Sequence, residues 1–265
     1  MKKTFSQKKS AFSLIELSIV LIIIGLLIAG VTGGASLIKS SELRSVMGEA
    51  RAYATAVNGF YTQFNYLPGD YGVVVGASAV GDADGKIEDY LSASISESHN
   101  AWMQMKAAAV LDGNSVSAPA YAPAAESSGV TVPASKVKAA VWDFDYRSNE
   151  AAPFTNEISQ NVVALISSTA TIPTASGVTI VNGANKAALA VLMATDALSI
   201  DAKIDDSVAG TGKVRGLNIG ISTTPSSLSA NTNDVTICYY STSFTYNTSD
   251  TVKSCGLTYQ VDVNS

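Results

Sequence analysis

The feature that most constrains this chain is an apolar run from Phe12 to Val31, in which the only ionisable side chain is Glu16. A helix rises about 1.5 Å per residue, so about 20 apolar residues cross the hydrocarbon core of a bilayer, which is roughly 30 Å thick. Four lysines precede the run, and by the positive-inside rule they hold that end in the cytoplasm. The sequence therefore predicts one membrane-spanning helix, with the rest of the chain on the far side.

Glu16 separates the interpretations that this run allows. A secretory signal peptide would have a shorter apolar region, followed by a cleavage site with small residues. A plain membrane anchor fits the length, but it leaves unexplained a carboxylate four residues into the hydrocarbon, where a charge costs about 2.5–3.5 kcal/mol. We therefore interpret Glu16 as a functional residue.

A resemblance to a known family begins at the same place. The stretch from Lys8 to Glu16, KKSAFSLIE, resembles the processing site of type IV prepilins and type II secretion pseudopilins: Gly or Ala, then Phe, then three residues, then Glu. The resemblance implies that a prepilin peptidase in the membrane cleaves after Ala11, where Gly is the commoner residue, and N-methylates Phe12. Glu16 then lies one helical turn from the new amine. That amine can neutralise the carboxylate, or, as the resemblance implies, the amine of a neighbouring subunit does so during assembly.

The fold expected from the pattern and from the resemblance is α+β, in three parts. Residues 1–11 are a leader, residues 12–66 a long N-terminal helix with its transmembrane part at 12–34, and residues 67–265 a globular head with an antiparallel sheet. In the second half of the helix, apolar residues recur every three or four positions, which is typical of one buried helix face. The polar positions between them, Glu49 among them, are expected on the opposite side. Pro68 ends the helix, because proline disfavours helical geometry in the residue before it.

The head is predicted to contain two short helices and several strands. Residues 97–111 have apolar residues at helical spacing, and His99 in the first turn is expected at the surface or as a cap. A second helix is expected within residues 186–204, with Thr195 able to cap it. Runs with strand character lie at 136–146, 162–167, 177–181, 213–219, 234–240, 244–246 and 257–263.

The only two cysteines, Cys238 and Cys255, lie close to the end of the sequence. In a domain outside the cytoplasm an even count favours a disulfide, which in the chain-entropy model is worth about 3 kcal/mol for a loop of this size. Two free buried thiols or a metal site are the alternatives. The region between the cysteines also resembles the disulfide-bounded C-terminal region of many type IV pilins.

Two acidic stretches are candidates for other roles. In the first, GDADGKIED, the carboxylates of Asp82, Asp84 and Glu88 resemble the opening of a calcium loop, although the full EF-hand spacing is absent. A solvated acidic turn is the alternative. The second runs from Asp196 to Asp206, where Lys203 can pair with Asp201 or Asp206. It resembles a stretch of some pilins that often carries Gly where this chain has Ser207. A structural role is expected there, with a cation or subunit contact as the alternative.

The residues give no sign of an enzyme. The chain has one histidine and no Ser/His/Asp arrangement, Cys/His pair, phosphate-binding glycine motif or zinc spacing. Loss of the four leader lysines lowers the formal net charge from −5 to −9. An acidic exterior argues against nucleic acid as a partner. We therefore expect no catalytic activity, and no cofactor unless the acidic turn binds calcium.

The resemblance implies a structural subunit of a type IV pilus. Such a subunit is held in the bacterial inner membrane as a single-pass precursor and then assembled by helix packing into a surface filament. Its partners would be copies of itself, other pilins, the prepilin peptidase and the inner-membrane assembly platform. The alternatives are a type II secretion pseudopilin in a periplasmic pseudopilus and a monomeric membrane-anchored extracytoplasmic binding protein. The disulfide favours the pilus, whereas a calcium loop would favour the pseudopilin.

Overall fold

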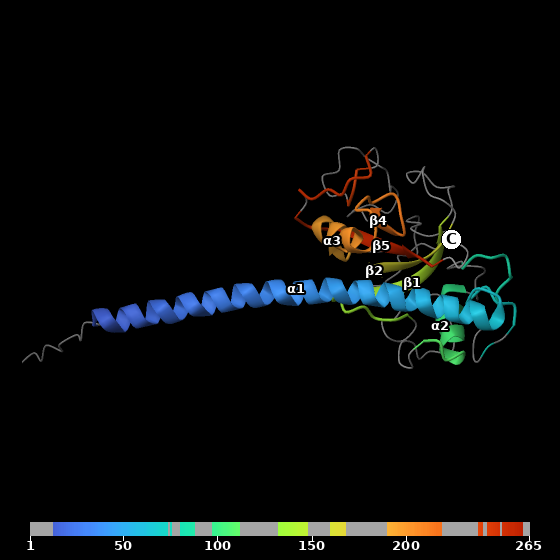
Figure 1. The fold of residues 1–265 in the computed structure, drawn as a ribbon, viewed down its shortest axis with the longest axis horizontal. Coiled ribbons are helices and arrows are strands. Elements are labelled where there is room, and N and C mark those ends of the chain that lie inside the picture. The colour runs from blue at the N-terminus through green and yellow to red at the C-terminus, as the bar shows by residue number, and fades with distance from the viewer. Residues whose placement is uncertain are drawn as a thin grey trace, which may run out of the picture. The chain divides into compact units, whose positions relative to one another are not determined.

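The architecture is α+β, as the sequence predicts. A computed structural model describes residues 13–73, 75, 80–87, 97–111, 132–147, 160–167, 190–218, 238–240, 243–249 and 251–261. Within these residues (Figure 1) lie α1 (Leu14–Phe64), α2 (Glu97–Ala107), β1 (Ala140–Arg147), β2 (Gln160–Ser167), β3 (Leu192–Met193), α3 (Ala194–Ile204), β4 (Val214–Asn218) and β5 (Lys253–Gln260). The chain divides into two compact units, Met1–Glu42 and Leu43–Ser265, and residues of α1 belong to both.

Helix α1 ends close to where the sequence predicts. Asn65 follows its last residue with φ +58°, and the Asn65 N–H donates to the carbonyl of Tyr61 at 2.7 Å. Asparagine is one of the few residues that adopt this left-handed conformation routinely, and it closes helices for that reason. Pro68 then prevents the helix from resuming. The expected start at Phe12 lies outside the described residues.

The second half of α1 provides one side of the core of the larger unit. Its buried residues recur every three or four positions, as expected. They are Leu43, Val46, Ala50, Tyr53, Ala56, Val57 and Phe60. The Tyr53 ring contacts both tryptophans edge to face, with centroids 4.9 Å from Trp102 and 5.6 Å from Trp142. Aromatic pairs of this kind add about 0.5–1.5 kcal/mol each beyond the area they bury.

Glu49 corrects the expected polar face of α1. Its Oε2 accepts hydrogen bonds from the Trp142 indole N–H and from the Ser135 hydroxyl, both at 2.7 Å. Its Oε1 accepts one from the Lys136 N–H at 3.0 Å. Glu49 therefore does not simply face solvent. Glu49 links the helix to Ser135, before β1, and to Trp142, in β1. These partners lie 86 and 93 residues further along the chain, so helical periodicity could not indicate them.

The five strands form one antiparallel sheet in which β5 is the central strand. The order is β1-β2-β5-β3, and β4 pairs with β5 as well. The predicted strands at 136–146, 162–167, 213–219 and 257–263 correspond to β1, β2, β4 and β5. The run at 177–181 lies outside the described residues. The described parts of 234–240 and 244–246 contribute an isolated bridge between Tyr239 and Tyr246 rather than strands.

The two short helices occur where expected, with two differences. His99 in α2 is buried, with 5% of its surface exposed, so the expected surface position is wrong. Helix α3 begins at Ala194 after Met193, which has extended geometry and gives no side-chain cap hydrogen bond. Thr195 is therefore inside the helix, where its carbonyl accepts from the Ser199 hydroxyl. Both differences arise because packing of the helices against the sheet, rather than local propensity, sets their ends and their buried faces.

Candidate functional site

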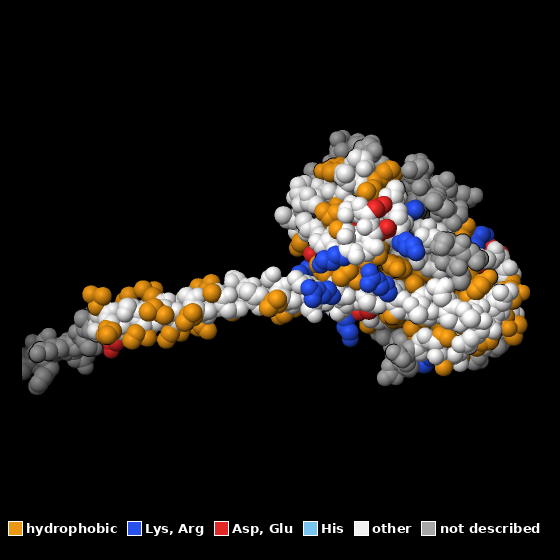
Figure 2. All heavy atoms as spheres, viewed as in Figure 1, with side chains coloured by type: hydrophobic (Ala, Val, Ile, Leu, Met, Phe, Trp, Pro, Cys, Tyr) orange, Lys and Arg blue, Asp and Glu red, His pale blue; other side chains and the backbone are white. Residues whose placement is uncertain are grey.

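The first candidate site is the apolar surface of the smaller unit. Between Leu14 and Val31 the large aliphatic side chains are 45–90% exposed, and hydrophobic groups follow one another along the helix (Figure 2). Soluble proteins rarely leave apolar patches of this extent in water. Helix α1 is the one described helix long and apolar enough to cross a membrane. This surface therefore requires lipid or other apolar helices as its surroundings.

Glu16 lies in the first turn of α1, within this apolar surface. Its Oε2 accepts a hydrogen bond from the Ser13 N–H at 2.8 Å. A carboxylate in this position satisfies one of the free N–H groups at a helix start and interacts favourably with the helix dipole. Ala11 and Phe12, the expected processing residues, lie outside the described residues.

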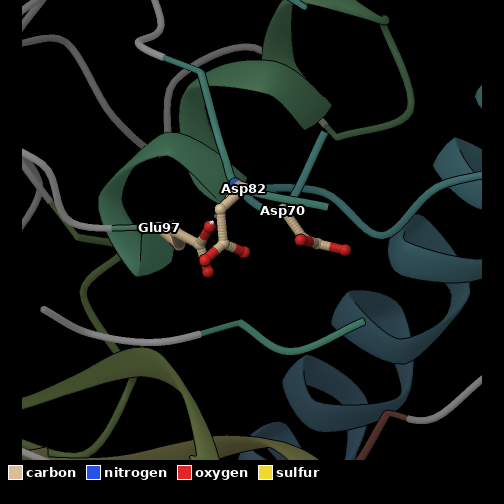
Figure 3. Close-up of side chains that lie close together, drawn as sticks. All are labelled: Asp70, Asp82 and Glu97. Carbon is tan, nitrogen blue, oxygen red and sulfur yellow. Dashed lines mark hydrogen bonds between the residues drawn. The ribbon is translucent and has the colours of Figure 1, made fainter. Parts of the chain in front are cut away.

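The second candidate site is a group of three carboxylates in the larger unit. Asp70, Asp82 and Glu97 each place one oxygen within 4.8 Å of the others (Figure 3). Asp70 and Glu97 are buried and Asp82 is exposed. Burial raises the pKa of the Asp70 carboxyl, and the negative charges of Asp84 and Asp82 raise it further, against hydrogen bonds from the Gly85 and Asp84 N–H groups.

The expected calcium ligands are only partly brought together. Asp82 belongs to the group of three, but the Asp84 carboxylate instead pairs with the Lys86 ammonium and accepts from the Lys86 N–H at 2.9 Å. Glu88 lies outside the described residues. The sequence did not single out Asp70 or Glu97, because 12 and 15 residues separate them from Asp82 and only the fold joins them. The Pro68-Gly69 pair directly before Asp70 indicates a turn in the chain, but it does not indicate that Asp70 is a metal ligand.

In a second acidic group, Asp201, Asp205 and Asp206, each carboxylate accepts hydrogen bonds from neighbouring residues. Asp201 accepts from the Tyr246 hydroxyl at 3.0 Å and from the Ser207 N–H at 3.3 Å. Asp205 accepts hydrogen bonds from the N–H groups of Lys213 and Val214. Asp206 accepts one from the Val208 N–H and one from the Thr211 hydroxyl. The expected pairing of Lys203 is not formed within the described residues. These contacts favour the structural role.

Burial raises the pKa of the Asp201 carboxyl to about 6, although the hydrogen bonds from Tyr246 and Ser207 act in the opposite direction. The charges of Asp206 and Asp205 raise it further. Asp201 is fully buried, so its carboxylate gives up hydration that two hydrogen bonds do not fully replace.

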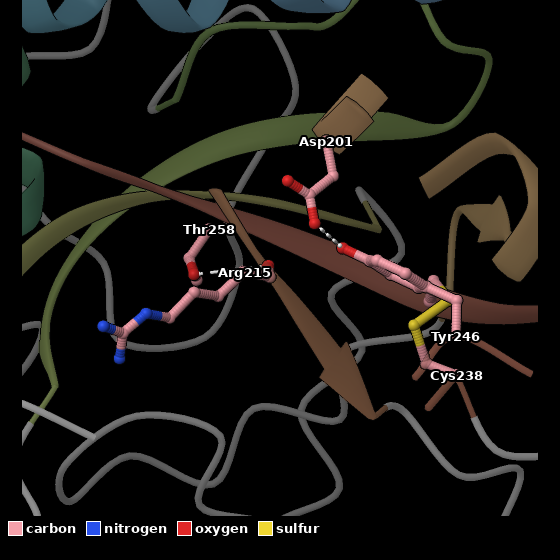
Figure 4. The surroundings of a disulfide bond; sticks show 6 residues. Asp201, Arg215, Cys238, Tyr246 and Thr258 are labelled. Carbon is pink, nitrogen blue, oxygen red and sulfur yellow. Dashed lines mark hydrogen bonds between the residues drawn. A yellow bond between two sulfur atoms is a disulfide. The ribbon is translucent and has the colours of Figure 1, made fainter. Parts of the chain in front are cut away.

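Cys238 and Cys255 form the predicted disulfide, so the alternatives of free thiols and a metal site are wrong. Cys255 belongs to β5, and the bond therefore fixes the preceding loop to the central strand. Figure 4 shows the Tyr246 hydroxyl, from the same loop, directed at the carboxylate of Asp201 on α3. The disulfide-bounded loop is thus attached to the sheet by a covalent bond and to α3 by a buried hydrogen bond.

Comparison with known proteins identifies the start of the chain. Residues 6–32 match the family model of the prokaryotic N-terminal methylation motif, the hallmark of type IV pilins and pseudopilins. No curated protein and no solved structure shows detectable similarity to the chain. The motif and the apolar helix together make this chain a pilin-like or pseudopilin-like precursor with a single pass through the inner membrane. The proteins that carry this motif are structural rather than catalytic.

Proposed function

We propose that this chain is a structural subunit of a type IV pilus. The observation that carries the proposal is the exposed apolar surface from Leu14 to Val31, with Glu16 in its first turn, inside the methylation motif. In this proposal residues 1–11 are a leader, the helix 12–66 crosses the membrane at 12–34, and residues 67–265 form the head. Cleavage after Ala11 and N-methylation of Phe12 by the prepilin peptidase yield the mature subunit.

Assembly replaces lipid around the apolar helix by the helices of other subunits. Lipid tails are as apolar as leucine, so the gain comes from close packing and from polar groups that find partners. Glu16 supplies the polar group, and its partner is the Phe12 amine of a neighbouring subunit. Because an unpaired carboxylate in an apolar surrounding is costly, this pair sets how far one helix slides along the next.

The partners follow from this mechanism. They are further copies of the chain, other pilins, the prepilin peptidase and the inner-membrane assembly platform. The head remains outside the packed helices and forms the filament surface. We propose no catalytic activity for it and no binding of nucleic acid.

The choice between pilus and pseudopilus rests on the head. The disulfide between Cys238 and Cys255 favours the pilus, because it resembles the disulfide-bounded C-terminal region of many type IV pilins. A type II secretion pseudopilin, which acts in the periplasm, is the second candidate, because the first acidic group could bind calcium.

Filaments sheared from the cell surface and analysed by mass spectrometry test the proposal. We expect this chain among the filament proteins, with a mature N-terminus at methylated Phe12. Recovery only from periplasmic pseudopili would support the second candidate. An uncut chain found solely as a membrane monomer would contradict both and favour a membrane-anchored binding protein.

A further inference from the structure

The group formed by Asp70, Asp82 and Glu97 has the composition of a cation site. Its members come from the turn after α1, from the following loop and from the first residue of α2. One oxygen of each lies within 4.8 Å of the others, and Figure 3 shows the three carboxylates side by side. Only 2% of the surface of Asp70 and none of Glu97 is exposed. Three ionised carboxylates at this separation repel one another, and either a cation between them or protonation of one of them relieves the repulsion.

One oxygen of the Asp70 carboxylate is buried without a hydrogen-bond donor, which is a second indication of a ligand. Its Oδ2 accepts a hydrogen bond from the Gly85 N–H at 3.0 Å. Its Oδ1 is buried and has no hydrogen-bond partner. In the described part of the chain, Lys86 pairs with Asp84, and neither Asp70 nor Asp82 forms an ion pair. A buried carboxylate oxygen without a partner costs about 1–3 kcal/mol or more, so its retention favours a ligand at this oxygen.

The backbone around the three carboxylates is held in place from two sides. The Gln104 side chain of α2 accepts from the Gly69 N–H at 2.7 Å. Asn161 of β2 accepts from the Ile87 N–H at 2.8 Å and donates to the Gly85 carbonyl at 3.1 Å. Asp70 is therefore positioned by a turn bound to α2, and the acidic loop by a side chain from the sheet.

Two glycines allow the close approach. A β-carbon at Gly69, which has φ +90°, would overlap the Glu97 carbonyl oxygen. A β-carbon at Gly81 would overlap the backbone of Asp70. Both positions place a backbone segment directly against a member of the group, so the carboxylates are brought together by the folded chain and not by flexible side chains alone.

We propose that Asp70, Asp82 and Glu97 bind a calcium ion. Calcium prefers oxygen ligands at 2.3–2.6 Å, so two ligands of one ion lie at most about 5.2 Å apart, and three oxygens within 4.8 Å of one another satisfy this limit. Three carboxylates leave the remaining coordination positions for carbonyl oxygens and water. The bound ion joins the end of the long helix to α2. Binding is a property of the unassembled chain, so its test is independent of assembly, and a bound ion counts toward the pseudopilin, the second candidate of the proposed function.

Calcium binding by the full chain in detergent is the direct test. We expect about one 45Ca²⁺ ion per chain in equilibrium dialysis. We also expect the melting temperature to rise by about 5 °C when EGTA is replaced by calcium at about 100 times Kd. Fluorescence of Trp102 and Trp142 reports unfolding of the head, since they are the only tryptophans and both are buried.

Two exposed aspartates of the same loop provide matched variants. Asp82→Asn should weaken calcium binding by at least about tenfold and abolish the calcium-dependent rise in melting temperature. Asp84→Asn removes the same charge two residues away and should bind calcium as the wild type does. No calcium-dependent shift in the wild type, or an equal shift with magnesium, would overturn the assignment. Loss of binding in Asp84→Asn with binding retained in Asp82→Asn would do so as well.

Discussion

Asp201 is a fully buried carboxylate whose charge works against the folded state. Its pKa is raised to about 6 by burial, compared with an ordinary value of 3.8. Between these two values the folded chain binds a proton that the unfolded chain does not. Stability from this residue is therefore present at low pH and is lost as the pH rises through about 6. The direction is opposite to that of an aspartate in an ion pair.

We predict that the free energy of unfolding falls by about 2 kcal/mol through this residue between pH 4.5 and pH 7.5. Denaturant unfolding of the wild type and of Asp201→Asn at both pH values measures it. Asparagine can still accept from the Ser207 N–H and donate to the Tyr246 hydroxyl. The difference between the two proteins isolates residue 201 from other titrating groups. A difference that does not change with pH would contradict the raised pKa.

Ser207 adopts a conformation that costs free energy. Its φ is +69°, in the left-handed region, and its side chain is exposed. This conformation costs a residue with a β-carbon about 1–2 kcal/mol. The pilins that this stretch resembles often carry Gly at this position, and glycine adopts a positive φ without the cost of a β-carbon.

We predict that Ser207→Gly raises the melting temperature by about 2 °C, because glycine removes the strain and keeps the N–H that donates to Asp201. Gly212→Ala is the opposite control. Gly212 has φ +74°, and a β-carbon there would overlap the Asp205 carboxylate, so this variant should be less stable. Thermal unfolding followed by tryptophan fluorescence measures both. A lower melting temperature for Ser207→Gly would contradict the strain argument.

At the scale of elements, the larger unit is held together where helices meet the sheet. Periodicity predicted the buried face of α1 and the existence of α2, an Ala- and Leu-rich composition indicated α3, and runs with strand character indicated β1, β2, β4 and β5. Periodicity could not predict that Glu49 would bind Trp142, or that His99 would be buried. Hydrophobic spacing is a local property, whereas both of these features depend on which element packs opposite.

Removal of the Glu49 carboxylate tests a polar contact between α1 and Trp142 of β1. Glu49→Ala leaves the Trp142 indole N–H without its acceptor, and 99% of that side chain is buried. We expect a loss of about 2 kcal/mol and a melting temperature lower by about 4–8 °C. Glu42→Ala removes the same charge from the same helix and should change the melting temperature little. Equal effects of the two substitutions would show that charge, rather than the contacts of Glu49, is responsible.

At the scale of the whole molecule, the two units are suited to different surroundings, the smaller one to an apolar medium and the larger one to water. The smaller unit exposes an apolar helix surface that lipid or neighbouring helices must cover. The larger unit has its own core, its own disulfide and a structured acidic loop. An apolar helix surface of this kind is stable in the membrane and can leave it only for another apolar surrounding, which in the proposed assembly the helices of neighbouring subunits provide.

Glu16 carries the prediction at this scale. Glu16→Ala and Glu16→Gln should both be cleaved to a chain that starts at Phe12. Both should enter filaments about tenfold less than the wild type, which corresponds to about 1.4 kcal/mol. The measure is the ratio of filament to membrane-bound chain by immunoblot. Thr32→Val is the control, since the Thr32 hydroxyl is already satisfied by the Ile28 carbonyl of its own helix.

The glutamine variant separates two roles of Glu16. Glutamine still offers an oxygen to the Ser13 N–H, so the start of the helix keeps its hydrogen bond. It carries no charge for the amine of a neighbouring subunit. Normal assembly of Glu16→Gln together with failure of Glu16→Ala would assign Glu16 to the helix start and would contradict its role in subunit register.

The sequence by itself determined the features that depend on neighbouring residues or on composition. These are the membrane-spanning run, the methylation motif, the end of the long helix, the periodic buried face and the pairing of the only two cysteines. The first four follow from chain geometry over a few turns of helix. The disulfide follows because the sequence contains no third cysteine with which either could pair.

The tertiary structure decided which distant polar groups meet. It placed Asp70 and Glu97 beside Asp82 and joined Glu49 to the residues before β1. The physical reason is that hydrogen bonds and cation sites act over a few ångströms, whereas the residues that form them lie tens of positions apart. Their separation in space is fixed only after the helices have packed on the sheet.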